Sequence, residues 1–346
     1  MPMAKGSFSI AGGGLSGLSA AITLARAGRK VSVYEKGAAC GARRQGDIEG
    51  LETWIFNDDP LSYMAAAGLP TQFAHLPQHS FNYVAPDGGL HTAEEGRPFF
   101  YLVRRGAEET SIDQAFYRQA VELGVRFHFR EAKKPGEVDL FAGGPKAANA
   151  YAHGITFRTT APDGVYLLLG REAAPSGYAY GIVWNGQGTL AAAFRRSSDG
   201  ADWTLERLVE RFSKVLGGPL SEKAEFAAYG HYAPKPTLFS GQTLLAGEAA
   251  GWQDALFGFG MNFAIRSGVI AARSLLDQDN YAALCKVELT GRLAASWVNR
   301  SIYERLSDRA MAKLAHKLIE RGAVWSTLHA AAQPSFIKGL MARLAA

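Results

Sequence analysis

Three glycines and one acid near the N-terminus carry the clearest chemistry in this sequence. Gly12, Gly14 and Gly17 have the spacing G-x-G-x-x-G, and Glu35 follows about 20 residues further on. The first glycine permits a tight turn, the second lets a pyrophosphate approach the backbone, and the third lets a helix pack closely on a strand. The acid suits the ribose hydroxyls of an adenosine. The pattern predicts a dinucleotide site.

The segments around these glycines have the order that such a site needs. Residues 7–11 predict an apolar strand, residues 15–28 a helix rich in Ala and Leu, and residues 30–35 an alternating second strand. Leu15 and Ser16 then begin the helix, where free N–H groups face phosphates. Lys36 follows the acid. A glycine-rich turn in an ordinary βαβ unit is the alternative, and the combined context disfavours it.

Length and composition set limits on the rest. The chain has 346 residues, of which 47% are hydrophobic and 20% charged, as expected for a globular protein of about two domains. No long apolar run predicts a membrane-spanning helix, and the first residues lack the apolar core of a signal peptide. Two cysteines, Cys40 and Cys285, suit a reducing cytoplasm and no disulfide framework. No residue spacing indicates a metal site.

The positive charge is concentrated near the C-terminus. Residues 286–346 contain ten Lys or Arg and four Asp or Glu, a balance of +6 against +5 for the whole chain. Residues 299–325 predict one helix, in which a cation recurs at every fourth position. These cations are Arg305, Arg309, Lys313, Lys317 and Arg321. A solvated face, contact with anionic lipid headgroups through 299–346, and an acidic protein partner all remain open. No motif supports nucleic-acid binding.

A second glycine-rich segment, residues 241–276, identifies the dinucleotide more closely. A buried strand stops at Gly247, a sharp turn carries Glu248, and a glycine-rich approach runs into a helix. The segment resembles the second flavin-binding motif of FAD enzymes with the aromatic-hydroxylase fold, which include geranylgeranyl reductases. The resemblance implies that Glu248, where Asp is usual, holds a ribityl hydroxyl, and that the helix start faces the flavin. The residues concerned are Gly247, Glu248, Gly251, Gly258, Gly260, Met261 and Asn262.

Four arginines are further candidates for cofactor contact. Residues 100–132 resemble the family's strand–arginine–helix segment, which implies that Arg104 or Arg105 lies near the flavin phosphates. Arg43 and Arg44 follow the second strand, where the family often has an arginine beside the cofactor. Solvated arginines are the alternative in both cases.

Two segments bear on the reaction. At 143–145 the sequence reads Gly-Gly-Pro, where the hydroxylases have Asp-Gly, which disfavours a nicotinamide-driven hydroxylase and leaves a redox protein as an electron donor. Residues 175–184 resemble a strand that lines the reductase cavity, with Pro175, Gly177 and Tyr178 matching and Tyr180 in place of Trp. Tyr178, Tyr180, Trp54 and Cys40 are the cavity candidates, although for Cys40 a buried, inert core thiol is the favoured interpretation.

The prediction is therefore an α/β protein. A Rossmann-like FAD-binding domain of the glutathione-reductase type takes 1–45, 97–145 and 237–280. A discontinuous, mostly-β substrate domain takes 46–96 and 146–236, and a helical C-terminal segment takes 281–346. The resemblance implies an FAD-dependent oxidoreductase that reduces C=C bonds of an apolar, isoprenoid-like substrate by hydride transfer. The cysteine content and the basic C-terminal segment predict a cytoplasmic location, with membrane association on the cytoplasmic face as an option. The alternatives are a group A flavin monooxygenase acting on an aromatic substrate and a non-catalytic prenyl-binding escort protein.

Overall fold

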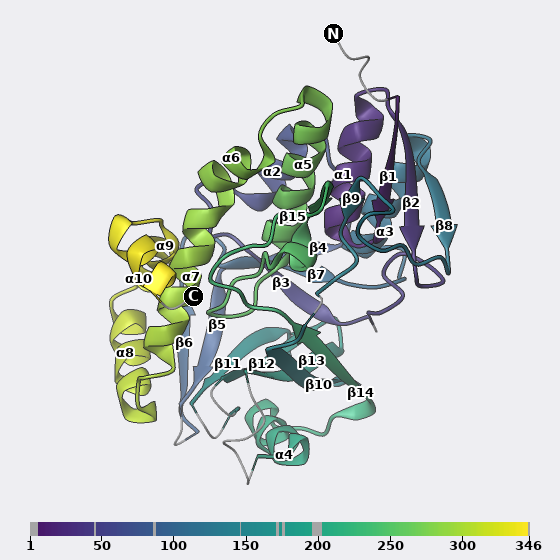
Figure 1. The fold of residues 1–346 in the computed structure, drawn as a ribbon. Helices are drawn as coiled ribbons and strands as arrows, with labels where there is room; N and C mark the ends of the chain where they lie inside the picture. The colour runs from purple at the N-terminus through teal and green to yellow at the C-terminus, as the bar shows by residue number, and fades with distance from the viewer. Residues whose placement is uncertain are drawn as a thin grey trace.

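Two large sheets lie at opposite ends of the molecule, with a small sheet between them and a helical region along one side (Figure 1). The computed structural model describes residues 6–44, 46–85, 88–145, 147–170, 173–174, 177–195 and 203–344. Pro175, one of the residues behind the family resemblance, lies outside these ranges. The α/β fold with a helical C-terminal region is as predicted.

The first sheet contains the predicted strand–turn–helix–strand unit. Its strands run in the order β15-β16-β9-β1-β2-β8, and all neighbours are parallel except β15 and β16. The bounds are β1 Ser7–Ala11, β2 Lys30–Glu35, β8 Arg126–Phe129, β9 Leu140–Phe141, β15 Phe239–Ser240 and β16 Thr243–Leu245. Parallel strands bury both faces, so helices must cover this sheet.

Three helices provide that cover, namely α1 (Leu15–Arg26), α3 (Ile112–Glu122) and α5 (Met261–Asp277). Helix α1 buries most of its length, as its Ala- and Leu-rich sequence predicts. Helices α1 and α5 cross very closely, since a Cβ on Gly268 would lie only 2.1 Å from the Ser16 carbonyl oxygen. The two glycine-rich segments are thereby brought to one edge of the sheet.

The second sheet is almost wholly antiparallel. Its order is β14-β10-β13-β12-β11-β5-β6, and only β11 and β5 run parallel. The bounds are β5 Ser80–Val84, β6 Leu90–Glu94, β10 Ala150–Arg158, β11 Gly164–Leu169, β12 Tyr178–Trp184, β13 Gln187–Phe194 and β14 Ser221–Gly230. Helix α4 (Leu205–Leu216) covers the outer face and buries Leu208 and Phe212 against it. The inner face is left to line a cavity.

A small antiparallel sheet joins the two large ones. It consists of β3 (Ile48–Glu52), β7 (Phe100–Arg104) and β4 (His75–Gln78), in the order β3-β7-β4. The sequence assigned 100–104 to the FAD-binding part, but β7 pairs with two strands from the part assigned to the substrate. The boundary at 97 therefore cuts through a sheet. A short helix, α2 (Pro60–Ala66), lies between β3 and β4 in the chain.

The C-terminal region is helical, but the single helix expected over 299–325 is wrong. The chain forms α6 (Tyr281–Cys285), a π-helical turn (Lys286–Thr290) and α7 (Gly291–Tyr303), then α8 (Asp308–Glu320), α9 (Val324–Ala332) and α10 (Phe336–Leu344). Helix α7 stops at Tyr303, and the Ser307 hydroxyl oxygen accepts a hydrogen bond from Ala310 N at 3.2 Å to start α8. Among the described residues, no helix is long and apolar enough to cross a membrane.

Candidate functional site

A cavity of about 1090 Å³ passes between the two large sheets. Its walls come from the turn after β1, the inner face of the second sheet, the loop before α5, and helices α8 and α9. The volume exceeds the usual range for a single small-molecule pocket, about 300–1000 Å³. The cavity is therefore large enough for a dinucleotide.

One end of the cavity is the predicted glycine cradle. Gly12 has a φ of +103°, and a Cβ there would lie 2.3 Å from the Ala142 carbonyl oxygen. A Cβ on Gly17 would lie 2.0 Å from the Gly12 carbonyl oxygen, so only glycine allows α1 to approach the turn. At Gly14, by contrast, a Cβ would meet no atom within 4 Å. Gly14 faces open space at the start of α1, where backbone N–H groups favour an anion.

Glu35 closes the same end. Its carboxylate accepts hydrogen bonds from Gly13 N at 2.7 Å and from Gly37 N at 2.6 Å. These bonds fix the acid at the carboxyl end of β2, beside the cradle, and a carboxylate has further lone pairs to accept hydroxyl donors. Lys36 and Arg43 also line this end.

A partly buried charge cluster forms one wall. The Arg105 guanidinium lies 2.6 Å from Glu49 Oε2 and 2.9 Å from Asp113 Oδ2, and Arg44 lies 2.5 Å from Glu49 Oε1. Burial opposes ionisation of Glu49, but the two arginines outweigh it and hold the pKa of this carboxyl below its usual range. The cluster stays ionised at neutral pH and fixes Arg44 and Arg105 at the cavity wall.

The second glycine-rich segment forms the opposite wall. A 3₁₀ turn, η2 (Gly247–Ala250), follows β16, and it places Glu248 on the cavity. Burial raises the pKa of the Glu248 carboxyl above its usual value, and nearby Arg44 opposes this shift. Gly258, Gly260 and Met261 then line the cavity as the chain enters α5.

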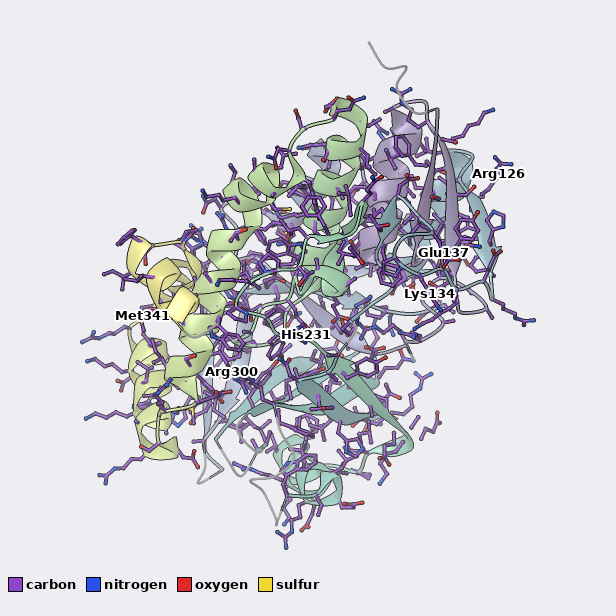
Figure 2. The ribbon with its side chains drawn as sticks, viewed as in Figure 1. Arg126, Lys134, Glu137, His231, Arg300 and Met341 are labelled. Carbon is purple, nitrogen blue, oxygen red and sulfur yellow. The ribbon has the colours of Figure 1, made fainter. Side chains whose placement is uncertain are left out.

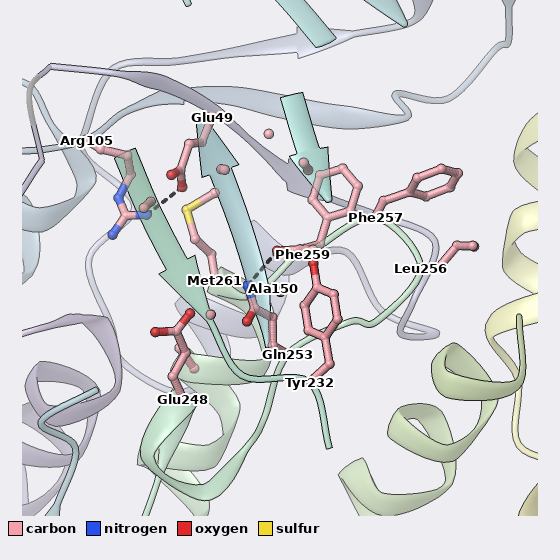
Figure 3. Close-up of a pocket in the computed structure, with 18 of the residues that line it drawn as sticks. Glu49, Arg105, Ala150, Tyr232, Glu248, Gln253, Leu256, Phe257, Phe259 and Met261 are labelled. Carbon is pink, nitrogen blue, oxygen red and sulfur yellow. Dashed lines mark hydrogen bonds and ion pairs between the residues drawn. The ribbon is translucent and has the colours of Figure 1, made fainter. Parts of the chain in front are cut away.

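The middle of the cavity is aromatic. Tyr178 and Tyr180 of β12 line it together with Tyr232, Phe257 and Phe259. Figure 3 shows Glu49, Arg105 and Glu248 on one side of Met261, and Tyr232, Phe257 and Phe259 on the other. The side chain of Gln253 is held between them by a bond from its Nε2 to the Gly258 carbonyl oxygen at 3.1 Å. The polarity therefore falls along the cavity, from the charged wall toward the aromatic one.

The far end is almost wholly apolar. It lies between the inner face of the second sheet and helices α8 and α9. Its lining residues include Phe81, Tyr83, Leu167, Met311, Leu318 and Leu328. Such a surface binds a ligand by area burial and offers few hydrogen bonds.

Most predicted site residues line this cavity, and five do not. Gly17 acts through helix packing, and Gly251 is the left-handed residue that ends η2, with a φ of +84°. The side chain of Asn262 is buried, where its Oδ1 accepts from Arg266 Nε at 2.8 Å. Arg104 faces away and stacks on Trp184.

Cys40 is the fifth. It is buried behind Gly13, and burial raises the pKa of its thiol to about 12. The predicted cavity residues that do line the site are Gly12, Gly14, Leu15, Ser16, Glu35, Lys36, Arg43, Arg44, Trp54, Arg105, Tyr178, Tyr180, Gly247, Glu248, Gly258, Gly260 and Met261.

Several polar residues of the cavity were not predicted from the sequence, among them Glu49, Asp113, Tyr232 and Gln253. Tyr232 follows β14 in a loop and is held by a reciprocal pair of bonds with Asn149, each 2.7 Å long. Nothing in a loop sequence marks such a contact across 83 positions. Asp113 had a local signal, because an acid in the first turn of a helix just after an arginine pair favours an ion pair.

This chain is similar to known proteins in sequence over one short segment and in fold over nearly its whole length. A family model described as an NAD(P)-binding Rossmann-like domain matches residues 10–48, and no curated protein matches. A geranylgeranyl bacteriochlorophyll reductase-like protein from Thermoplasma acidophilum has a TM-score of 0.69 at 18% identity, covering 97% of this chain and 95% of that one. The flavin-dependent brominase Bmp2 has a TM-score of 0.65 at 15% identity, covering 98% of each chain.

A further structural neighbour is p-nitrophenol 4-monooxygenase from Pseudomonas putida, with a TM-score of 0.64 at 13% identity, covering 95% of this chain and 96% of that one. These similarities extend over nearly the whole chain, including both large sheets. Residues 10–48 therefore form a Rossmann-like dinucleotide-binding unit, and the chain as a whole has the fold of FAD-dependent oxidoreductases.

Proposed function

We propose that this protein is an FAD-dependent oxidoreductase that reduces C=C bonds of an apolar, isoprenoid-like substrate. The observation that carries the proposal is the continuity of the cavity, which runs from a dinucleotide cradle through an aromatic section to an apolar end. The structural neighbours include both a reductase-like protein and flavin-dependent halogenases.

The residues present fit FAD. The open space at Gly14 suits a pyrophosphate, and Glu35 suits an adenosine ribose. Glu248 and the start of α5 at Met261 suit the ribityl and pyrimidine parts, because the helix N-terminus favours negative charge. When bound, FAD supplies two-electron redox chemistry.

In the proposed reaction the protein itself orients the substrate, excludes water from the cavity and supplies a proton. Trp54, Phe257 and Phe259 exclude water from the middle of the cavity. Within the described part of the chain, the hydroxyls of Tyr180 and Tyr232 donate no hydrogen bond, and both side chains line the cavity. Burial raises the pKa of both hydroxyls. They stay protonated and are the candidates to donate a hydrogen bond or a proton to the substrate.

The first test concerns the cofactor and the reaction together. The purified protein is expected to be yellow and to release FAD on denaturation. After anaerobic reduction with dithionite, addition of geranylgeraniol is expected to restore the oxidised flavin spectrum and to give a product two hydrogens heavier. A yellow protein whose reduced flavin is unchanged by geranylgeraniol would remove the reductase assignment while leaving the cofactor assignment intact.

A second candidate is a flavin monooxygenase acting on an aromatic substrate. It is favoured by the resemblance in fold to p-nitrophenol 4-monooxygenase and by the phenolic side chains in the middle of the cavity. Oxygen consumption and NADPH oxidation that a phenol stimulates would support it. A colourless protein that takes up no added FAD would instead support the non-catalytic, prenyl-binding alternative.

A further inference from the structure

Helix α10 presents an apolar face to solvent. Phe336, Ile337, Leu340 and Met341 are 87%, 69%, 49% and 46% exposed, and their spacing puts them on one side of the helix. The opposite side is anchored, because Ala342 is buried against Ala294 and Val298 of α7.

Two further contacts fix this orientation. Lys338 Nζ donates to the Ala331 carbonyl oxygen at 2.5 Å, which ties α10 to the end of α9. A Cβ on Gly291, at the start of α7, would lie 2.8 Å from Pro334, so the two helices begin in contact. The fold therefore holds the apolar face outward. Large exposed residues gathered in this way mark an interaction surface.

Helix α8 presents a basic face beside it. Arg309, Lys313, Lys317 and Arg321 are exposed, and none of the four forms an ion pair with an acid in the described part of the chain. The opposite side of α8 faces the cavity through Met311, Leu318 and Ile319. One helix thus carries cations outward and lines the apolar end of the cavity inward.

The two faces lie on the same side of the molecule. In Figure 2, Met341 lies at the edge of the molecule above α8, and the long side chains of α8 extend toward that edge. The cavity also opens here, because Ile302 and Leu314 both line it and are 51% and 47% exposed. An apolar patch, a row of cations and a cavity mouth are therefore neighbours.

We propose that the apolar face of α10 and the basic face of α8 together dock on an anionic lipid bilayer. Apolar residues that enter the acyl boundary, beside cations that contact the headgroups, form the combination that interfacial helices use. A second copy of the chain fits less well, since it would bring another row of like charges toward the first. If the proposed function holds, the apolar substrate would leave the bilayer and enter the cavity through the mouth beside α8.

The test is co-sedimentation of the full chain with vesicles. Vesicles of phosphatidylcholine containing about a third phosphatidylglycerol are expected to bind the protein, and pure phosphatidylcholine vesicles to bind it far more weakly. Binding is expected to fall as salt rises, because screening shortens to about 3 Å at 1 M. The assay needs neither substrate nor turnover, so its outcome is separate from that of the proposed function.

Two double variants, each with a control elsewhere on the molecule, test whether this surface binds the vesicles. Phe336→Ser with Ile337→Ser is expected to weaken binding about tenfold or more. The matched control is Val121→Ser with Leu123→Ser, two residues exposed at the C-terminal end of α3. Lys313→Gln with Lys317→Gln is expected to weaken binding about fivefold per charge, and Lys30→Gln with Arg126→Gln is its control.

Three results would overturn the proposal. One is absence of binding to the anionic vesicles. Another is equal loss of binding in the control variants, which would show general charge or hydrophobicity instead of this surface. The third is a concentration-dependent dimer that only the Phe336→Ser, Ile337→Ser variant loses while its vesicle binding is unchanged, which would assign the face to a second copy.

Discussion

Gly14 and Gly17 belong to one motif but have different physical roles. The space beside Gly14 is empty of protein, whereas the space beside Gly17 is filled by the Gly12 carbonyl oxygen at 2.0 Å from an added Cβ. The space beside Gly14 is free for a ligand, whereas Gly17 allows α1 to pack against the turn. A larger side chain at Gly14 should therefore impair cofactor binding, whereas one at Gly17 should lower the stability of the fold.

We expect Gly14→Val to fold normally and to lose FAD, because the branched side chain enters the space that a pyrophosphate needs. The measurement is flavin absorbance of the purified variant against its far-ultraviolet circular dichroism. Gly17→Val is the contrasting control and should lower the melting temperature. A folded Gly14→Val protein at full FAD occupancy would contradict the placement of the cofactor.

Glu52 is a buried acid that the sequence did not single out. It is fully buried in β3, and its carboxyl oxygens have no hydrogen-bond partner among the described residues. Burial raises the pKa of Glu52 to about 8, with Asp254 adding to the shift. In an unfolded chain a glutamate titrates at about 4.3. The folded state therefore binds one more proton than the unfolded state between these two values.

The consequence is a stability that falls as pH rises across this window, by about 1.4 kcal/mol per pH unit from this group. Glu52→Gln removes the titration, so its stability relative to the parent should increase from pH 5 to pH 8. Urea unfolding at several pH values measures this. If the difference between the two proteins does not change with pH, Glu52 is already ionised in the folded state.

At the scale of elements, helix α8 is the most weakly anchored wall of the cavity. Among its described residues only Met311 is buried, and its N-terminus depends on the Ser307 cap. Local stability of this kind permits a helix to open without unfolding the molecule. Ligand entry beside Leu314 would use that freedom.

Removal of the Ser307 cap should destabilise the first turn of α8 and leave the rest of the fold unchanged. Ser307→Ala is expected to cost about 1 kcal/mol and to speed amide hydrogen exchange in residues 308–313 several-fold. Ser111→Ala, which removes the comparable cap of α3 at Gln114 N, should instead affect exchange in 112–117. Unchanged exchange in α8 after Ser307→Ala would show that tertiary contacts alone hold the helix.

At the scale of the whole molecule, the loop at 143–145 and the basic face of α8 both bear on how electrons reach the flavin. The loop at 143–145 lines the cavity beside Arg43, without the acid that the hydroxylases have there. The departure from the hydroxylase sequence predicts a weaker site for a nicotinamide cofactor at this loop. The exposed cations of α8, which we propose to contact a bilayer, are also the surface that we expect an acidic redox carrier to use.

We therefore expect that neither NADH nor NADPH alone reduces the bound flavin quickly, whereas dithionite or a small redox protein does. Anaerobic stopped-flow at the flavin absorbance band measures the rate. Rapid bleaching by NADPH at the rate of turnover would refute this expectation and favour the monooxygenase. Reduction by an acidic carrier that slows in high salt would support charge steering.

The sequence alone determined the cradle, because its chemistry is local. Gly12, Gly14, Gly17 and Glu35 act through backbone conformation and short-range geometry within one βαβ unit, so their spacing was enough. The same holds for Gly247 and Glu248, which end a short strand next to a helix start. Here local propensity and the fold agree.

Only the tertiary structure decided which neighbours face the cavity. Successive residues along a strand point to opposite sides, so Arg104 or Arg105 could not be chosen until β7 was placed. In the structure, Arg105 forms ion pairs with Glu49 and Asp113, whereas Arg104 stacks on Trp184. Cys40 was likewise placed behind Gly13 by packing, which no spacing reveals.

The break between α7 and α8 could be predicted only in part from the sequence. The fourfold spacing of the cations continues through residues 304–307 and favoured one helix, although Ser307 followed by Asp308 is a recognisable helix start. The Tyr303 hydroxyl, which bonds the Gly177 carbonyl oxygen at 2.6 Å, fixes the end of α7 against the second sheet. The spacing of the cations shows which residues would share one face of a helix. It does not show where the helix ends, because that depends on contacts with strands distant in the sequence.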